Sequence, residues 1–166
     1  GAGADTLTGG NGTDTASYAN ALAGVMASLA NAGVNTGDAS GDVYSSIENL
    51  LGSANNDTLI GDGNANVIDG GSGNDTLIGG AGADTLTGGI GTDTVWYRTA
   101  ASCLTASLGN TALNTGDALG DVYATIENLT GSGFADTLYG DGSANAIDGG
   151  DGNDTLIGGT GADTLT

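Results

Sequence analysis

Short strand-like triplets recur along the chain every nine residues, and glycine-rich stretches separate them. The shared pattern is Gly-Gly-x-Gly-x-Asp-x-apolar-x. Six residues of each unit suit a tight corner, and three suit a strand whose middle residue points inward while its flankers point outward. Two units running in opposite directions complete a turn of 18 residues. The pattern therefore predicts an all-β solenoid with an inward aliphatic ladder of Leu59, Ile68, Leu77, Leu86 and Val95.

A longer period contains the short one. When the chain is shifted by 79 residues onto itself, 87 positions overlap without a gap and about 60 of them are identical. Both ends of the chain have nearly the same phase in this period, so we interpret the chain as a segment of a longer array. We expect one continuous solenoid over 1–166, with a first period at 1–79 (insert 18–51, nonapeptides 52–79), a second at 80–158 (insert 97–130, nonapeptides 131–158) and the start of a further repeat at 159–166.

The inserts interrupt the nonapeptides once per period. Alternating apolar residues at Val25, Ala27 and Leu29 indicate a strand, although a helix over 19–30 remains an alternative. Each period holds five nonapeptides, so an insert that forms three further half-turns gives eight half-turns per period. We therefore expect successive copies to start on the same side of the solenoid.

Composition excludes several classes of function. Twenty acidic residues face a single basic residue, so the net charge of −19 disfavours nucleic acid and anionic membrane surfaces as partners. Without histidine and with one cysteine, the chain cannot build a histidine-based catalytic relay, a Cys/His zinc site or an internal disulfide. No apolar stretch reaches 18 residues, so we expect no membrane span, and the first residues do not resemble a signal peptide. The sequence therefore predicts a protein that is not an enzyme.

The aliphatic core is too thin to hold the turns alone. One buried leucine per nonapeptide contributes about 2 kcal/mol, whereas ordering the backbone costs about 1 kcal/mol or more for each residue. Stacked turns also place the sixth-position residues in columns, with Asp57, Asp75 and Asp93 along one edge and Asn66 and Asp84 along the other. At a rise of about 4.8 Å per rung, neighbouring carboxylates repel each other. A hard divalent cation removes this repulsion, and carboxylate and carbonyl oxygens are the ligands that calcium prefers.

The nonapeptides resemble the RTX family of haemolysin-type calcium-binding repeats. The full motif occurs in GGSGNDTLI at 70–78, GGAGADTLT at 79–87, GGDGNDTLI at 149–157 and GGTGADTLT at 158–166. The resemblance implies a right-handed parallel β-roll with a row of Ca²⁺ along each edge, type I secretion, and folding outside the cell or at its surface. It implies several ions, about four to eight in this segment.

The resemblance also assigns candidate metal ligands. These are the corner aspartates Asp5, Asp14, Asp57, Asp75, Asp84, Asp93, Asp136, Asp154 and Asp163, and the glycines Gly71, Gly73, Gly80, Gly82, Gly89, Gly91, Gly150, Gly152, Gly159 and Gly161. Some corners depart from the motif: Asn66 and Asn145 replace the sixth-position aspartate, and Asp62 and Asp141 replace the second glycine, so ion sites there are altered. In the inserts, Asp38, Asp42, Asp117 and Asp121 either bind an extra ion or turn the chain.

The outward ninth positions differ between the two faces. One face is expected to carry an apolar stripe of Ile60, Ile78, Trp96, Tyr139 and Ile157, and the other Asp69, Thr87, Asp148 and Thr166. The stripe is expected to be covered by the insert or to mediate lateral self-association.

Three functions fit this pattern. A gapless duplication without a catalytic residue set favours a calcium-binding structural repeat of a secreted rod, such as an adhesin, a surface-layer protein or an extracellular fibre. The alternative is the calcium-dependent C-terminal folding and secretion domain of an exported protease or lipase. Regular outward threonines at the seventh position suggest an ice-binding solenoid as a minor alternative.

Overall fold

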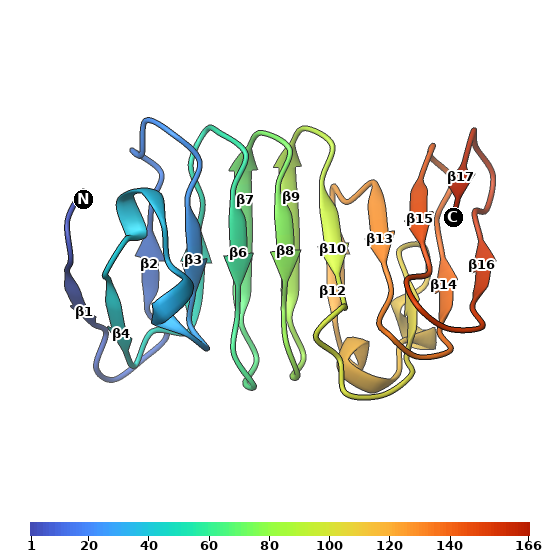
Figure 1. The fold of residues 1–166 in the computed structure, drawn as a ribbon, viewed down its shortest axis with the longest axis horizontal. Coiled ribbons are helices and arrows are strands. Elements are labelled where there is room, and N and C mark those ends of the chain that lie inside the picture. Colours follow the sequence, from blue (N-terminus) through green and yellow to red (C-terminus); the bar gives the residue numbers. More distant parts are fainter.

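A computed structural model describes residues 1–166 and consists almost entirely of short strands that stack along one axis (Figure 1). The strands are β1 (Thr6–Thr8), β2 (Thr15–Ser17), β3 (Met26–Ser28), β4 (Val43–Ser45), β5 (Asn49–Leu51), β6 (Thr58–Ile60), β7 (Val67–Ser72), β8 (Thr76–Ile78), β9 (Thr85–Ile90), β10 (Thr94–Trp96), β11 (Thr105–Ser107), β12 (Val122–Ala124), β13 (Asn128–Thr130), β14 (Thr137–Tyr139), β15 (Ala146–Asp148), β16 (Thr155–Ile157) and β17 (Thr164–Leu165). The helical elements are four 3-10 turns, η1 (Ala32–Val34), η2 (Gly37–Ala39), η3 (Thr111–Leu113) and η4 (Gly116–Ala118). None of these could cross a membrane.

All strand pairs that form the ladders are parallel, as the predicted β-roll requires. In the nonapeptide region each residue pairs with the residue 18 positions later, for example Leu59 with Leu77. Four sheets result, with the strand orders β1-β4, β12-β9-β7-β5-β2, β17-β15-β13-β10-β8-β6-β3 and β11-β14-β16. The predicted 18-residue turn is confirmed.

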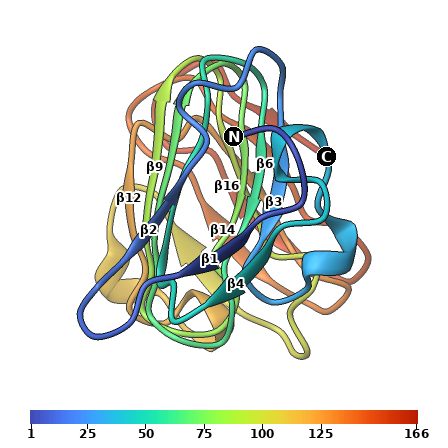
Figure 2. The same cartoon turned by 90° about the vertical axis from the view of Figure 1, so that its left-hand side faces the viewer.

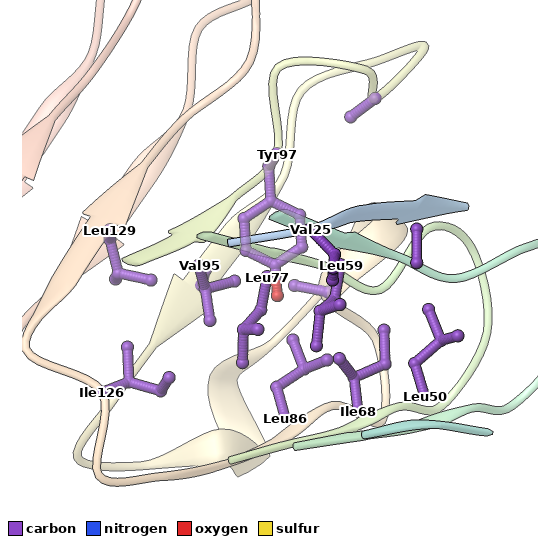
Figure 3. Packing of buried hydrophobic residues seen from close by; sticks show 14 of the residues in the cluster. Val25, Leu50, Leu59, Ile68, Leu77, Leu86, Val95, Tyr97, Ile126 and Leu129 are labelled. Atoms are coloured by element: carbon purple, nitrogen blue, oxygen red, sulfur yellow. The ribbon is translucent and has the colours of Figure 1, made fainter. Parts of the chain in front are cut away.

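The core is a double row of aliphatic side chains between facing sheets (Figure 3). All five predicted ladder residues are fully buried. Figure 3 shows Leu59, Leu77 and Val95 in a row on the seven-stranded sheet, opposite Ile68 and Leu86 on the five-stranded sheet. Each nonapeptide buries one such residue, so the core is as thin as the sequence predicts.

Each insert adds three strands, as expected, but the arrangement of those strands differs from the prediction. The first insert forms β3, β4 and β5, so the alternative of a helix over 19–30 is wrong, because β3 lies there. Strands β2, β3 and β4 belong to three different sheets, so this turn has three sides instead of two. Residues 29–42 then form the bulge with η1 and η2.

The three-sided turn moves each copy to a new pair of sheets. Strand β2 lies in the five-stranded sheet, whereas its counterpart β10 lies in the seven-stranded sheet. Our expectation that successive copies start on the same side is therefore wrong. Eight strands per period would return each copy to the same sheet only if every turn consisted of two strands, and the insert turn consists of three. Figure 2 shows the consequence, with the 3-10 turns of the first insert on one side of the roll and those of the second insert on the other.

The shift of sheets also breaks the predicted apolar stripe. Ile60, Ile78 and Trp96 lie on the seven-stranded sheet, but Tyr139 and Ile157 lie on the three-stranded sheet β11-β14-β16. On the seven-stranded sheet the stripe continues instead as Thr130, Asp148 and Thr166. Ile78 is buried by the chain itself, Ile60 and Trp96 are half-buried, and Ile157 is exposed. The predicted continuous stripe is wrong.

Candidate metal sites

The corner at 70–75 illustrates how the glycine motif positions a carboxylate. Gly71 and Gly73 have φ values of +96° and +126°, a conformation that side chains other than glycine rarely adopt. This tight corner aims the Asp75 side chain along the stacking axis, where its Oδ1 accepts a hydrogen bond of 2.8 Å from the backbone N–H of Asp57 in the preceding rung. All ten predicted glycines have positive φ, namely Gly71, Gly73, Gly80, Gly82, Gly89, Gly91, Gly150, Gly152, Gly159 and Gly161.

Hydrogen bonds between successive rungs link the corners into columns. One column contains Asp57, Asp75, Asp93, Glu127, Asn145 and Asp163, and a second contains Asp14, Glu48, Asn66, Asp84 and Asp121. Two shorter columns pair Asp136 with Asp154 and Asp5 with Asp42. The structure thus brings all nine predicted corner aspartates into columns. At most links a side-chain oxygen accepts from the N–H one rung earlier, but Asn66 and Asn145 donate their side-chain amides to the carbonyls of Glu48 and Glu127.

Four corner carboxylates keep one oxygen that is buried without any hydrogen-bond partner. These are the Oδ2 atoms of Asp14, Asp75, Asp84 and Asp93. A methyl group added at Gly70 would contact Oδ2 of Asp75 and lie 2.7 Å from the carbonyl oxygen of Gly88 in the next rung. The orphan oxygen and a backbone carbonyl therefore face the same small space, which only glycine leaves open.

The orphan carboxylates are electrostatically costly in the protein alone. Burial raises the pKa of Asp75 and Asp84 to about 6, and neighbouring carboxylates add to the effect. Burial also raises the pKa of Asp93, with a further contribution from the charge of Glu127. A nearby positive charge would reverse these shifts.

The chemistry of this donor set fits a hard cation such as Ca²⁺. Its members are carboxylate and backbone carbonyl oxygens, which are calcium ligands. The structure gathers no cluster of three or more histidine, cysteine, aspartate or glutamate side chains. An ion at these corners would therefore take one or two carboxylates and complete its shell with carbonyl oxygens.

Two further predicted aspartates are satisfied by serines of their own corners. Asp57 accepts hydrogen bonds from the backbone N–H and the hydroxyl of Ser53 as well as from Val25 N–H. Asp136 is held in the same way by Ser132, with a hydroxyl bond of 2.8 Å. These two carboxylates have protein donors on both oxygens, unlike Asp75.

The corners with asparagine are closed by the amide itself. Asn66 accepts a hydrogen bond of 2.8 Å from Asp62 N–H and donates one of 2.7 Å to the carbonyl of Glu48 in the preceding rung. Asp62 accepts from the backbone and side-chain amides of Asn64 and so stabilises the turn. The second copy repeats the closure with Asn145, Asp141 and Glu127. We find no orphan oxygen at either corner.

The insert aspartates fall into two groups. Asp42 is buried and accepts from Asp5 N–H at 2.9 Å and from the Tyr18 hydroxyl at 2.7 Å; Tyr18 also bonds the Tyr44 hydroxyl. Asp121 has the same partners in the second copy, Asp84, Tyr97 and Tyr123. Asp38 and Asp117 lie half-exposed in η2 and η4 and do not join the columns.

Glu48 and Glu127 were not identified from the sequence as candidate corner residues. Oε2 of Glu48 accepts a hydrogen bond of 2.9 Å from Asp14 N–H, and Oε2 of Glu127 accepts one of 2.8 Å from Asp93 N–H, the role that aspartate has at other corners. A signal was available, because each glutamate stands two residues before an inward leucine and therefore occupies the sixth position of the unit.

The chain's one basic side chain lies on the outer face of the seven-stranded sheet. The guanidinium of Arg98 lies 5.5 Å from the centroid of the Trp96 ring and 2.8 Å from Asp148. A hollow of about 280 Å³ beside it is lined by Arg98, Ser132, Gly133, Asp148, Gly150 and Asp151. The free thiol of Cys103 is exposed.

Comparison with known proteins agrees with this geometry. A search of curated proteins gives no match. A family model of the RTX calcium-binding nonapeptide repeat matches four segments, residues 1–17, 44–77, 69–98 and 128–165, which together cover more than half of the chain. The chain therefore belongs to the family of RTX calcium-binding nonapeptide repeat proteins.

Proposed function

We propose that this chain is a non-catalytic structural segment of a secreted extracellular rod, such as an adhesin, a surface-layer protein or a fibre, and that calcium stabilises its corners. The observation that carries the proposal is the set of four buried carboxylate oxygens without a partner, which recur in register at the corners. The near-identical 79-residue copies support a role in which repetition sets length.

In this mechanism the corner residues would bind the ions. Asp14, Asp75, Asp84 and Asp93 would hold the ions together with backbone carbonyls of the adjoining rungs, such as that of Gly88 beside Asp75 and that of Thr125 beside Asp93. When bound, calcium supplies the positive charge that compensates the buried carboxylates and joins one rung to the next. Without it, repulsion along the columns and a net charge of −19 oppose compaction of a chain with little apolar core.

Folding that depends on calcium is suited to export of the chain. An extended, acidic chain passes readily through a secretion channel, and folds at the calcium concentrations found outside cells, which match dissociation constants of about 10⁻⁴ to 10⁻³ M for extracellular modules. We therefore propose a secreted or cell-surface location and export by type I secretion. The proposed domain organisation is one continuous solenoid over residues 1–166.

Circular dichroism and calcium titration of the 166-residue chain test the proposal. We expect a coil spectrum in chelator, a strand spectrum in millimolar calcium, and several bound ions per chain. An unchanged spectrum together with no calcium binding in a calorimetric titration would contradict it. Magnesium at the same concentration is the control for charge screening, since it demands tighter octahedral geometry.

A further inference from the structure

The glutamate corners differ from all others in length and backbone. Across a glutamate corner the inward residues are six positions apart, as from Tyr44 to Leu50 and from Tyr123 to Leu129, whereas across a nonapeptide corner they are nine apart, as from Leu59 to Ile68. Ser46 and Thr125 have positive φ values of 53° and 50°, which non-glycine residues rarely adopt. The chain's two glutamates both lie here, and the extra methylene lets each carboxylate reach the N–H of the preceding rung from a shorter corner.

On its N-terminal side, the second glutamate corner has the features of an open ion site. Asp93 is fully buried and its Oδ2 has no partner. A methyl group added at Gly88 would lie 2.5 Å from this Oδ2 and would also contact the carbonyl oxygen of Thr125. Glu127 accepts a hydrogen bond of 2.8 Å from the Asp93 N–H, so its carboxylate lies next to the backbone of the residue whose free oxygen faces the Thr125 carbonyl.

On its C-terminal side, the same corner is closed. The amide Nδ2 of Asn145 donates a hydrogen bond of 2.9 Å to the carbonyl oxygen of Glu127. An aspartate side chain here has no N–H to donate, so a carboxylate oxygen would face that carbonyl in place of the amide. The first copy repeats both sides, with Asp14 and Glu48 on the open side and Asn66 on the closed side.

We propose that Glu127 and Glu48 provide the terminal acidic ligand of each ion row, and that Asn145 and Asn66 end the row by substituting an amide for the next ion. Calcium would then bind in separate runs, interrupted once per 79-residue period just after the insert. This inference rests on the proposed function, because it assigns ligands within the same rows.

Native mass spectrometry of the calcium-loaded 166-residue chain tests the proposal by counting ions. Asn145→Asp and Asn66→Asp should each add one ion. Asn110→Asp is the matched control, because Asn110 caps η3 on the exposed surface and the substitution changes charge equally, so it should add none.

The complementary variants are Glu127→Gln and Glu48→Gln, which keep a side-chain oxygen to accept the N–H of Asp93 or Asp14. Each should remove one ion or weaken one site about tenfold or more. The control is Asp151→Asn, an exposed position outside the columns. Circular dichroism of each variant in calcium verifies that the roll has formed.

The results separate the two proposals. A wild-type chain that binds no calcium would overturn the proposed function. A wild-type chain that binds several ions, with ion counts unchanged in folded Asn145→Asp and Glu127→Gln variants, would overturn only the assignment of row ends.

Discussion

The nonapeptide corners and the inserts both bury carboxylates, but they compensate the buried charge in opposite ways. Asp75, Asp84 and Asp93 each keep a buried oxygen that accepts no hydrogen bond from the protein. Asp42 and Asp121 accept from a backbone N–H and from a tyrosine hydroxyl, and burial raises the pKa of the tyrosines, which keeps them neutral donors. On the proposed function, the corners with an unpaired carboxylate oxygen would take a cation, whereas protein groups alone compensate Asp42 and Asp121.

The inserts also hold more of the apolar core. Tyr97, Ala100, Leu104, Ala106 and Ala118 are buried in the second insert, whereas each nonapeptide buries one aliphatic residue. The comparison indicates that one chain can combine turns in which protein groups compensate the buried charge with turns that depend on a ligand for it. On the proposed function, the part of each copy around Asp42 or Asp121 would not depend on calcium and would support the rungs beside it.

Removal of calcium should produce the largest difference in stability between the nonapeptides and the inserts. Each ion at 100 times its dissociation constant contributes about 2.7 kcal/mol, so losing several removes a free energy comparable with the ordinary stability of a domain, about 5–15 kcal/mol. In hydrogen exchange with chelator, we expect residues 52–96 to lose protection first and the inserts to lose it last. Equal loss of protection in both regions would contradict the distinction between them.

Acidification should act in opposite directions with and without calcium. Asp75 and Asp84 have pKa values near 6 in the fold, above the ordinary value of 3.8, so their protonation favours the folded chain. This contribution is complete below pH 3.8 and is lost as the pH rises through about 6. In chelator, circular dichroism should therefore show more strand at pH 5 than at pH 7. With calcium, protons compete for the same oxygens and the affinity should fall over that range.

The Asp75→Asn, Asp84→Asn double variant provides the control for this titration. It lacks both titrating groups, so its strand content in chelator should depend less on pH. A pH response equal to that of the wild type would show that other groups are responsible.

Removing one insert hydroxyl should destabilise the calcium-independent turn. Tyr97→Phe leaves Oδ2 of Asp121 without its 2.6 Å donor, and a buried unsatisfied group costs about 1–3 kcal/mol. Urea unfolding in saturating calcium measures the loss. Tyr139→Phe is the matched control, because Tyr139 is half-exposed on β14 and its hydroxyl has no hydrogen-bond partner within the chain. Equal stability of the two variants would contradict the role of the tyrosine network.

The smallest effect is expected at the surface ion pair. Arg98→Ala removes the ion pair with Asp148 and the contact with the Trp96 ring. The side chains of Arg98 and Asp148 are about half exposed, so we expect the free energy of unfolding to fall by about 1 kcal/mol or less. Thermal unfolding would shift by no more than about 4 °C. A larger shift would show that Arg98 anchors the second insert, which the account does not predict.

The sequence predicts the regular part of the fold well because its period is strict. Counting by nine places Leu59 and Leu77 in one ladder, and counting by 18 places Asp75 and Asp93 in one column, as the structure has them. It could not predict the three-sided turn, because three strands per insert are compatible with either two or three sides. That choice depends on the short corner at Ser46 and on packing of the bulge, and neither leaves a periodic signal.

The candidate sites follow the same division. Repetition of the motif identifies Asp75, Asp84 and Asp93, whose orphan oxygens the structure then reveals. It does not distinguish them from Asp57. Ser53 donates hydrogen bonds to both oxygens of Asp57, but in the sequence a serine at this corner position does not indicate that role. Glu127 could have been found from its distance to Leu129, but its role depends on the shape of the insert turn.

Anomalous diffraction at long wavelength from crystals grown in calcium tests the central claim most directly, because it locates the ions without reference to the protein atoms. The account predicts peaks at the corners, between backbone carbonyls and the Oδ2 atoms of Asp75, Asp84 and Asp93, and none beside Asn66 or Asn145. An ordered, compact roll without peaks at these aspartates would contradict it.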